Sequence, residues 1–294
     1  MFPMHLRGVS AILMAGVAIG GMSVGTVALA ANAPFLAHQA SYDLALVKSR
    51  RSPSIDGARG RILYNFSGNN CEGYSTEFRQ MSEIDTGEGR MTQSDMRSTS
   101  WESADGKSYR FHIETKMNDK DPETIDGFAE RTAGGVTVKL KQPATKTLTL
   151  DSNVVFPTEQ VERIVEAARA GKSLLELSVY DGSDGGEKVF NTLSVIGQPI
   201  PGDRAPAKPD VATGSDALKS LTRWPVTVSY FDRAEPSGTG EQTPVYAMSF
   251  ELYENGVSRA LVLDYNDFIL GGSIASFDAK ATKAETKVDA KACN

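Results

Sequence analysis

Apolar and polar residues alternate along much of this chain. Tyr42, Leu44 and Leu46, for example, are separated by Asp43 and Ala45. Because successive side chains of a strand point to opposite faces, this period of two predicts strands with one face buried in a core. The same period recurs at Phe111-Ile113-Thr115, Val136-Val138-Leu140, Leu175-Leu177-Val179, Val226-Val228-Tyr230, Tyr246-Met248-Phe250-Leu252 and Leu261-Leu263-Tyr265.

Turn-forming residues fall between these runs. Asn255-Gly256 is the clearest pair, since both residue types accept the positive φ values that a two-residue hairpin requires. Strands joined by such turns run antiparallel. The fold class predicted from the pattern is therefore mainly β, with an antiparallel core.

One segment, from Thr158 to Ala170, departs from the alternation. Its apolar residues recur at i, i+3, i+4 and i+7, the stripe of an amphipathic helix. Thr158 is predicted to cap the first amides, and Gly171 to end the helix in the left-handed conformation. We expect this helix to cover the mouth or an open end of the sheet. Its stripe consists of Val161, Ile164, Val165 and Ala168.

The first thirty residues have the layout of a secretory signal peptide. A basic segment ending at Arg7 precedes an apolar run, and Ala28-Leu29-Ala30 supplies small residues ahead of a cleavage site. Cleavage is expected after Ala30, with Ala33 as the second choice. The alternative is an uncleaved membrane anchor, because the run approaches the length of a spanning helix. The favoured interpretation places a mature protein in a bacterial periplasm, without stable membrane insertion.

Three segments make up the predicted organisation: a signal peptide (1–30), a single β domain (31–277) and a flexible C-terminal strap (278–294). The strap is rich in Ala, Lys, Thr and Asp and lacks the apolar content to pack. The Pro- and Gly-rich stretch 198–209 predicts a long surface loop, with a domain boundary as the alternative.

The charge balance argues against one class of partner. The chain carries 31 Lys and Arg against 37 Asp and Glu, a formal net charge of −6. A nucleic-acid-binding domain requires an excess of basic residues, so nucleic acid is not an expected partner.

Only two cysteines occur, Cys71 and Cys293. In an oxidising compartment the simplest expectation is one disulfide between them, and the alternative is a pair of unrelated free thiols. Such a bond would tie the extreme C-terminus to the N-terminal third of the chain.

The residues that could carry catalysis are few. Outside the predicted signal peptide, His38 and His112 stand alone in or beside predicted strands, and no metalloprotease, serine-hydrolase or phosphate-loop motif is present. We therefore expect neither a metal nor a cofactor. The stretch Asp181–Gly186 looks like a calcium loop, but Gly185 and Thr192 stand where an EF-hand requires oxygen ligands, so a hairpin turn is the favoured interpretation.

Several motifs are distinctive at the level of a family. They are His38-Gln39-Ala40-Ser41-Tyr42-Asp43-Leu44, Phe156-Pro157-Thr158-Glu159, Glu166-Ala167-Ala168-Arg169-Ala170-Gly171-Lys172, Tyr180-Asp181-Gly182-Ser183-Asp184-Gly185-Gly186, Lys188-Val189-Phe190, Asn255-Gly256-Val257 and Leu263-Asp264-Tyr265. With these motifs the chain resembles the EipB family of periplasmic cell-envelope integrity proteins, long catalogued only as a domain of unknown function. The likeness covers nearly all of the chain after the predicted cleavage site.

The resemblance implies a monomeric, cup-like antiparallel β-spiral, or open barrel, of about fourteen strands around one helix near the middle of the chain. It also implies a disulfide from the N-terminal part to the C-terminus, onto which Cys71 and Cys293 map, a role in resistance to envelope stress, and a periplasmic tetratricopeptide-repeat protein as a partner. It implies no catalytic residues.

Three hypotheses of function follow. The first is a non-enzymatic protein that binds a partner protein, a peptide or a lipid in a concave sheet. The second is a periplasmic hydrolase of cell-wall glycan, with a carboxylate pair drawn from residues such as Glu114, Asp181 and Glu251. The third is a purely structural module, which would expose an apolar patch without a cavity. The first is the predicted function.

Overall fold

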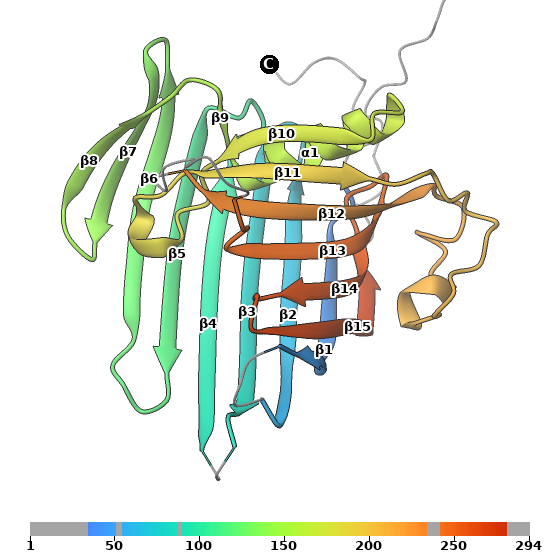
Figure 1. The fold of residues 1–294 in the computed structure, drawn as a ribbon. Helices are drawn as coiled ribbons and strands as arrows, with labels where there is room; N and C mark the ends of the chain where they lie inside the picture. The colour runs from blue at the N-terminus through green and yellow to red at the C-terminus, as the bar shows by residue number, and fades with distance from the viewer. Residues whose placement is uncertain (1–34, 51–54, 88–89, 234–241, 281–294) are drawn as a thin grey trace, which may run out of the picture. The chain divides into compact units, whose positions relative to one another are not determined.

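The protein folds into one large antiparallel sheet (Figure 1). The computed structural model describes residues 35–50, 55–87, 90–233 and 242–280. The first eight strands are β1 (His38–Ser49), β2 (Gly57–Asn69), β3 (Gly73–Asp85), β4 (Met91–Glu102), β5 (Ser108–Met117), β6 (Glu123–Thr132), β7 (Gly135–Gln142) and β8 (Lys146–Leu150).

The second half of the chain supplies a helix, two short 3-10 turns and the remaining strands. These are β9 (Val154–Val155), α1 (Pro157–Arg169), β10 (Leu174–Val179), η1 (Asp184–Gly186), β11 (Phe190–Ile196), η2 (Val211–Gly214), β12 (Arg223–Asp232), β13 (Tyr246–Tyr253), β14 (Ser258–Asp264) and β15 (Phe268–Ala279).

Strand β1 joins the two halves of the sheet. It pairs with β2 on one side and with β15 on the other, so the order runs from β8 down to β1 and then from β15 down to β9. All pairs are antiparallel except β9 with β10, which is parallel. The two halves run roughly across each other in Figure 1. The predicted class, a mainly β fold with one α-helix, is confirmed, with fifteen strands in place of about fourteen.

Helix α1 lies between the two halves of the sheet. Ile164, Val165 and Ala168 are buried in the same cluster as Tyr42 of β1 and Val228 of β12. The apolar stripe expected from the sequence therefore packs in the core. Gly171 has φ +70°, as the predicted left-handed C-terminus requires.

The start of α1 differs from the prediction. Phe156 is the N-cap and Pro157 the first helical residue, so Thr158 lies inside the first turn and its side chain does not cap the helix. The cap comes from β4: the Glu102 carboxylate accepts the backbone N–H of Thr158 at 2.8 Å and of Glu159 at 2.9 Å. A proline at the first helical position has no N–H to satisfy, and the N-cap lies at Phe156, two residues before the predicted Thr158.

The proline-rich stretch 198–209 is a loop, as predicted. Buried ion pairs attach the segment that follows it to the sheet. Arg259, only 2% exposed, bonds Asp210 through Nε at 3.0 Å and Glu251 through Nη1 at 2.6 Å, and Arg223 also bonds Glu251 at 2.8 Å. Strands β11 and β12, on either side of this region, pair directly in the sheet.

The C-terminal strap was predicted to start two residues too early. Asp278 and Ala279 belong to β15, where they pair with β1, and the Lys280 amide donates to the Ala37 carbonyl at 2.9 Å. The backbone N–H and C=O groups of β1 form hydrogen bonds with this polar sequence. Such bonds do not depend on the hydrophobicity of the side chains.

Two other predicted segments cannot be compared with the structure. The signal peptide (1–30), the rest of the strap (281–294) and with it Cys293 lie outside the described residues. Cys71 lies at the exposed turn between β2 and β3, and its pairing with Cys293 stays a prediction. Within the described part of the chain, no helix has the length and apolar character needed to cross a membrane.

Candidate functional site

A cavity of about 400 Å³ lies between the inner face of β2 to β5 and the first turns of α1. Its walls are mostly aromatic and aliphatic, with a few hydroxyl groups. Strand β13 reaches it through Met248, and the turn at Asn255-Gly256 also borders it. The sheet therefore holds a concave apolar space, as the binding hypothesis expected.

The cavity exists because β4 presents small side chains to the interior. Ser98 and Ser100 point inward beside Met96, whereas Arg97 and Thr99 alternate with them on the exposed face. On the opposite wall, the apolar stripe of α1 fills the space only in part. Val161 is the stripe residue that lines the cavity. Serine is too small to close the remaining gap.

One end of the cavity is polar and centres on Asp181. Its Oδ1 accepts hydrogen bonds from the Ser183 amide at 2.9 Å and the Ser183 hydroxyl at 2.7 Å. The Tyr109 hydroxyl donates to the Asp181 backbone carbonyl at 2.9 Å, which fixes this loop against β5. Burial raises the pKa of the Asp181 carboxyl above its ordinary value, and the Ser183 bonds oppose that shift.

This loop is the stretch that looked like a calcium site in the sequence. It forms a turn between β10 and β11, as favoured above, with Gly182 and Gly185 at positive φ. In the described part of the chain no three His, Cys, Asp or Glu residues gather closely enough to hold a metal ion.

The other end of the cavity is aromatic and lies at β1 and β2. His38 is only 2% exposed, and its ring centroid lies 5.4 Å from that of Tyr64 and 6.1 Å from that of Phe66. Its Nδ1 lies 2.7 Å from the Leu36 carbonyl oxygen, so Nδ1 carries the proton and Nε2 is an acceptor. Burial lowers the pKa of His38 and raises that of Tyr64 to about 12, so both side chains are uncharged at neutral pH.

The three carboxylates named for the hydrolase hypothesis are not brought together. Asp181 lines the cavity, Glu114 lies among the outward-facing positions of β5, and Glu251 is held between Arg223 and Arg259. His112 also lies on the outer face, 3.3 Å from Asp126. The sequence reasoning missed Glu102, whose distance from the helix along the chain gave no signal of its capping role.

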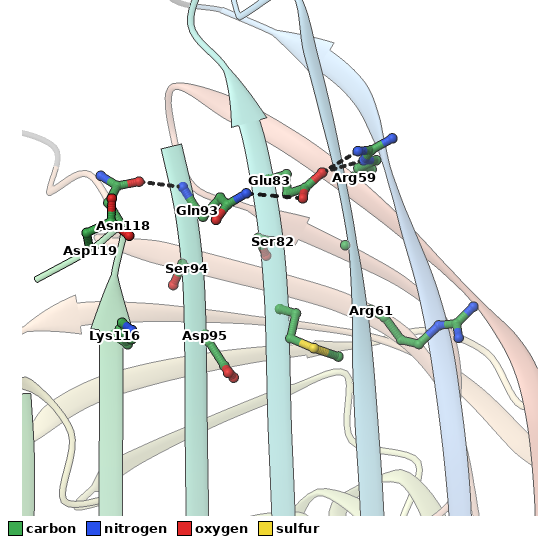
Figure 2. Close-up of a pocket in the computed structure, with 12 residues that line it drawn as sticks. Arg59, Arg61, Ser82, Glu83, Gln93, Ser94, Asp95, Lys116, Asn118 and Asp119 are labelled. Carbon is green, nitrogen blue, oxygen red and sulfur yellow. Dashed lines mark hydrogen bonds and ion pairs between the residues drawn. The ribbon is translucent and has the colours of Figure 1, made fainter. Parts of the chain in front are cut away.

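A second hollow, of about 540 Å³, lies on the outer face of β2 to β5 and is polar (Figure 2). Bonds connect its side chains across the strands. Glu83 accepts from Arg59 at 2.6 Å and from the Gln93 amide at 3.4 Å, and the Asn118 side chain accepts the Gln93 backbone N–H at 2.8 Å. Because these polar and charged groups bond one another, we interpret this face as a solvated surface and the inner cavity as the candidate site.

Comparisons with known proteins agree with this architecture. A family model described as EipB-like matches residues 29–281. The chain is 34% identical over 242 residues to a protein of Brucella abortus (strain 2308) named cell envelope integrity protein EipB, with 82% of this chain and 83% of that protein covered. It is also similar to a crystal structure of a β-barrel-like protein of a domain of unknown function from Brucella abortus, with a TM-score of 0.74, 32% identity, and 83% of this chain and 98% of that chain covered.

Proposed function

This chain belongs to the EipB-like family, and from that premise we propose that it supports cell-envelope integrity from the periplasm by binding an apolar ligand in its inner cavity. The ligand class is an acyl chain or an extended apolar peptide segment. The relative's name supports the envelope role, and the predicted signal peptide supports the location.

The observation that carries the proposal is the apolar cavity between the sheet and α1. It falls within the range of about 300 to 1,000 Å³ typical of ligand sites, with an apolar lining and a small number of polar groups at one end. Each square ångström of apolar ligand surface removed from water contributes about 25 cal/mol, so a chain buried along this cavity gains substantial affinity.

Binding fits the chemistry of the site better than hydrolysis. A glycosidase requires two carboxyl groups about 5 to 10 Å apart across a cleft. Of the carboxylates considered for that role, Asp181 is the one that lines this cavity. A tetratricopeptide-repeat protein of the periplasm is the partner that the family resemblance suggests.

The test is to recover the mature protein from its native periplasm under mild conditions and to identify co-purifying molecules by mass spectrometry. The variant Ser98→Leu extends a side chain into the cavity, and Thr99→Leu, the adjacent residue on the outer face of β4, is the matched control. We expect the ligand to be lost from Ser98→Leu and kept by Thr99→Leu.

The same two variants should also differ in the resistance that they give to cells. Strains carrying Ser98→Leu should be sensitive to detergents and wall-targeting antibiotics like a deletion strain, whereas Thr99→Leu should restore resistance. If nothing co-purifies, Ser98→Leu restores full resistance and the purified protein cleaves wall fragments, the binding function is wrong and a hydrolase replaces it.

A further inference from the structure

The cavity lining carries no cationic side chain among the residues that the structure describes. Its polar groups are hydroxyls, the Asn255 turn, the uncharged imidazole of His38 and the carboxyl of Asp181. Carriers of anionic amphiphiles need an Arg or Lys to neutralise the head group, because an unpaired charge is costly to remove from water. This cavity offers no such partner.

Further carboxyl groups lie around the polar end, and one of them, that of Asp184, is paired with Lys188 at 2.5 Å. Asp184 lies close enough to Asp181 to raise the pKa of its carboxyl further, and the Asp181 and Glu102 carboxyls both raise the pKa of Tyr109. The contacts of Asp181 that oppose this shift are uncharged hydrogen bonds from Ser183 and the backbone. An anion at this end would therefore meet the Asp181 carboxyl, whose own contacts include no basic side chain.

The arrangement suits an elongated molecule with one polar end. Asp181 is fixed against β5 through Tyr109, whereas His38 is on β1, and four strand spacings of about 4.8 Å separate those strands, roughly 19 Å along the sheet. Aromatic rings and Met96 line the space between. The Asp181 carboxyl can accept a hydrogen bond from a donor at the polar end of a ligand, besides those it accepts from Ser183.

We propose that the cavity selects uncharged amphiphiles, in which an apolar chain ends in a hydrogen-bond-donating amide or alcohol at Asp181, and that it rejects the carboxylate of a free fatty acid. This inference rests on the proposed binding function and names its ligand class. An alkylammonium ion would also donate to Asp181. However, the mostly apolar surroundings make it costly to remove a second charge from water beside Asp181, even when the two charges pair.

The experiment is a competition assay on the mature protein with a neutral fluorescent dye, N-phenylnaphthylamine, at about pH 8, where laurate is ionised. Dodecanamide, dodecanol, laurate and dodecylammonium share one chain length and differ in the head group. We expect the amide and the alcohol to displace the dye at concentrations at least about tenfold lower than laurate or dodecylammonium.

Two variants locate the selectivity. Asp181→Asn keeps an acceptor for Ser183 and removes the carboxyl, so laurate should gain at least about threefold in apparent affinity. Glu114→Gln, on the outer face of β5, should leave every affinity unchanged. Thermal melts of both variants establish that they are folded.

The outcomes separate this inference from the function beneath it. If all four probes compete equally, or if laurate or dodecylammonium binds most tightly, the cavity binds chains without the proposed selectivity, and the inference is wrong while the binding function stands. If the dye is not bound and no probe is detected by calorimetry, both fail.

Discussion

The buried carboxylate of Glu102 gives the sharpest test of how α1 is held against the sheet. Glu102 is 4% exposed and accepts the two free amides at the start of the helix, at 2.8 and 2.9 Å. Burial raises its pKa from 4.5 to about 7, the helix amides oppose that shift, and the nearby Glu162 carboxyl adds to it. The variant to compare is Glu102→Gln, which keeps one acceptor and does not titrate.

The direction of the pH dependence follows from linkage. Between about pH 4.5 and pH 7 the folded state binds the Glu102 proton more tightly than the unfolded chain does, so raising the pH through this window removes stability. The full shift corresponds to at most about 3 kcal/mol, since each pKa unit is worth about 1.4 kcal/mol. The unfolding free energy of Glu102→Gln does not show this pH-dependent decrease, because Gln does not titrate.

Urea unfolding at several pH values measures the effect. The difference in unfolding free energy, wild type minus Glu102→Gln, should decrease by about 2 to 3 kcal/mol from about pH 4.5 to about pH 8. Glu114→Gln, on the outer face of β5, is the control and should follow the wild type. If the wild type and Glu102→Gln change in parallel, the carboxylate is not buried as described and the reasoning fails.

Three further predictions concern other parts of the fold. Hydrogen bonds from Arg79 lower the pKa of Asp95 to about 2, so Asp95→Asn should cost about 1 kcal/mol at neutral pH, and this cost should decline below about pH 4 and vanish only near pH 2; a constant cost would contradict this. Arg259→Met should destabilise by about 3 kcal/mol or more, and a double-mutant cycle with Asp210→Asn should show coupling above about 1 kcal/mol, whereas additive effects would exclude the buried pair. Non-reducing mass spectrometry of periplasmic protein should show Cys71 joined to Cys293, and two free thiols would refute the bond.

Some elements were predictable because their sequence carries the period of the structure. β1, β12 and β14 bury mostly Leu, Val and aromatic side chains at alternate positions, and α1 buries Ile164 and Val165 on one stripe. In these segments the hydrophobic pattern alone identifies both the element and its buried face.

The strands that build the cavity carry a weaker signal. The inward positions of β4 are Ser, Thr, Met and Glu102, and most of its outward positions are polar as well, so no alternation of hydrophobicity marks it as a strand. β3 is similar. The low hydrophobicity that hides β4 from sequence reasoning also leaves the space that a ligand can fill.

The sequence by itself determined the fold class and the helix, because these depend on local periodicity, whereas the signal peptide that it indicates stays a prediction. Only the tertiary structure decided that Glu102 caps α1, that Arg259 holds Asp210, and that Asp181 and His38 line one cavity. These residues are far apart along the chain. Their meeting depends on the pairing of β1 with β15 and on how the sheet curves around the helix, and neither has a local signature in the sequence.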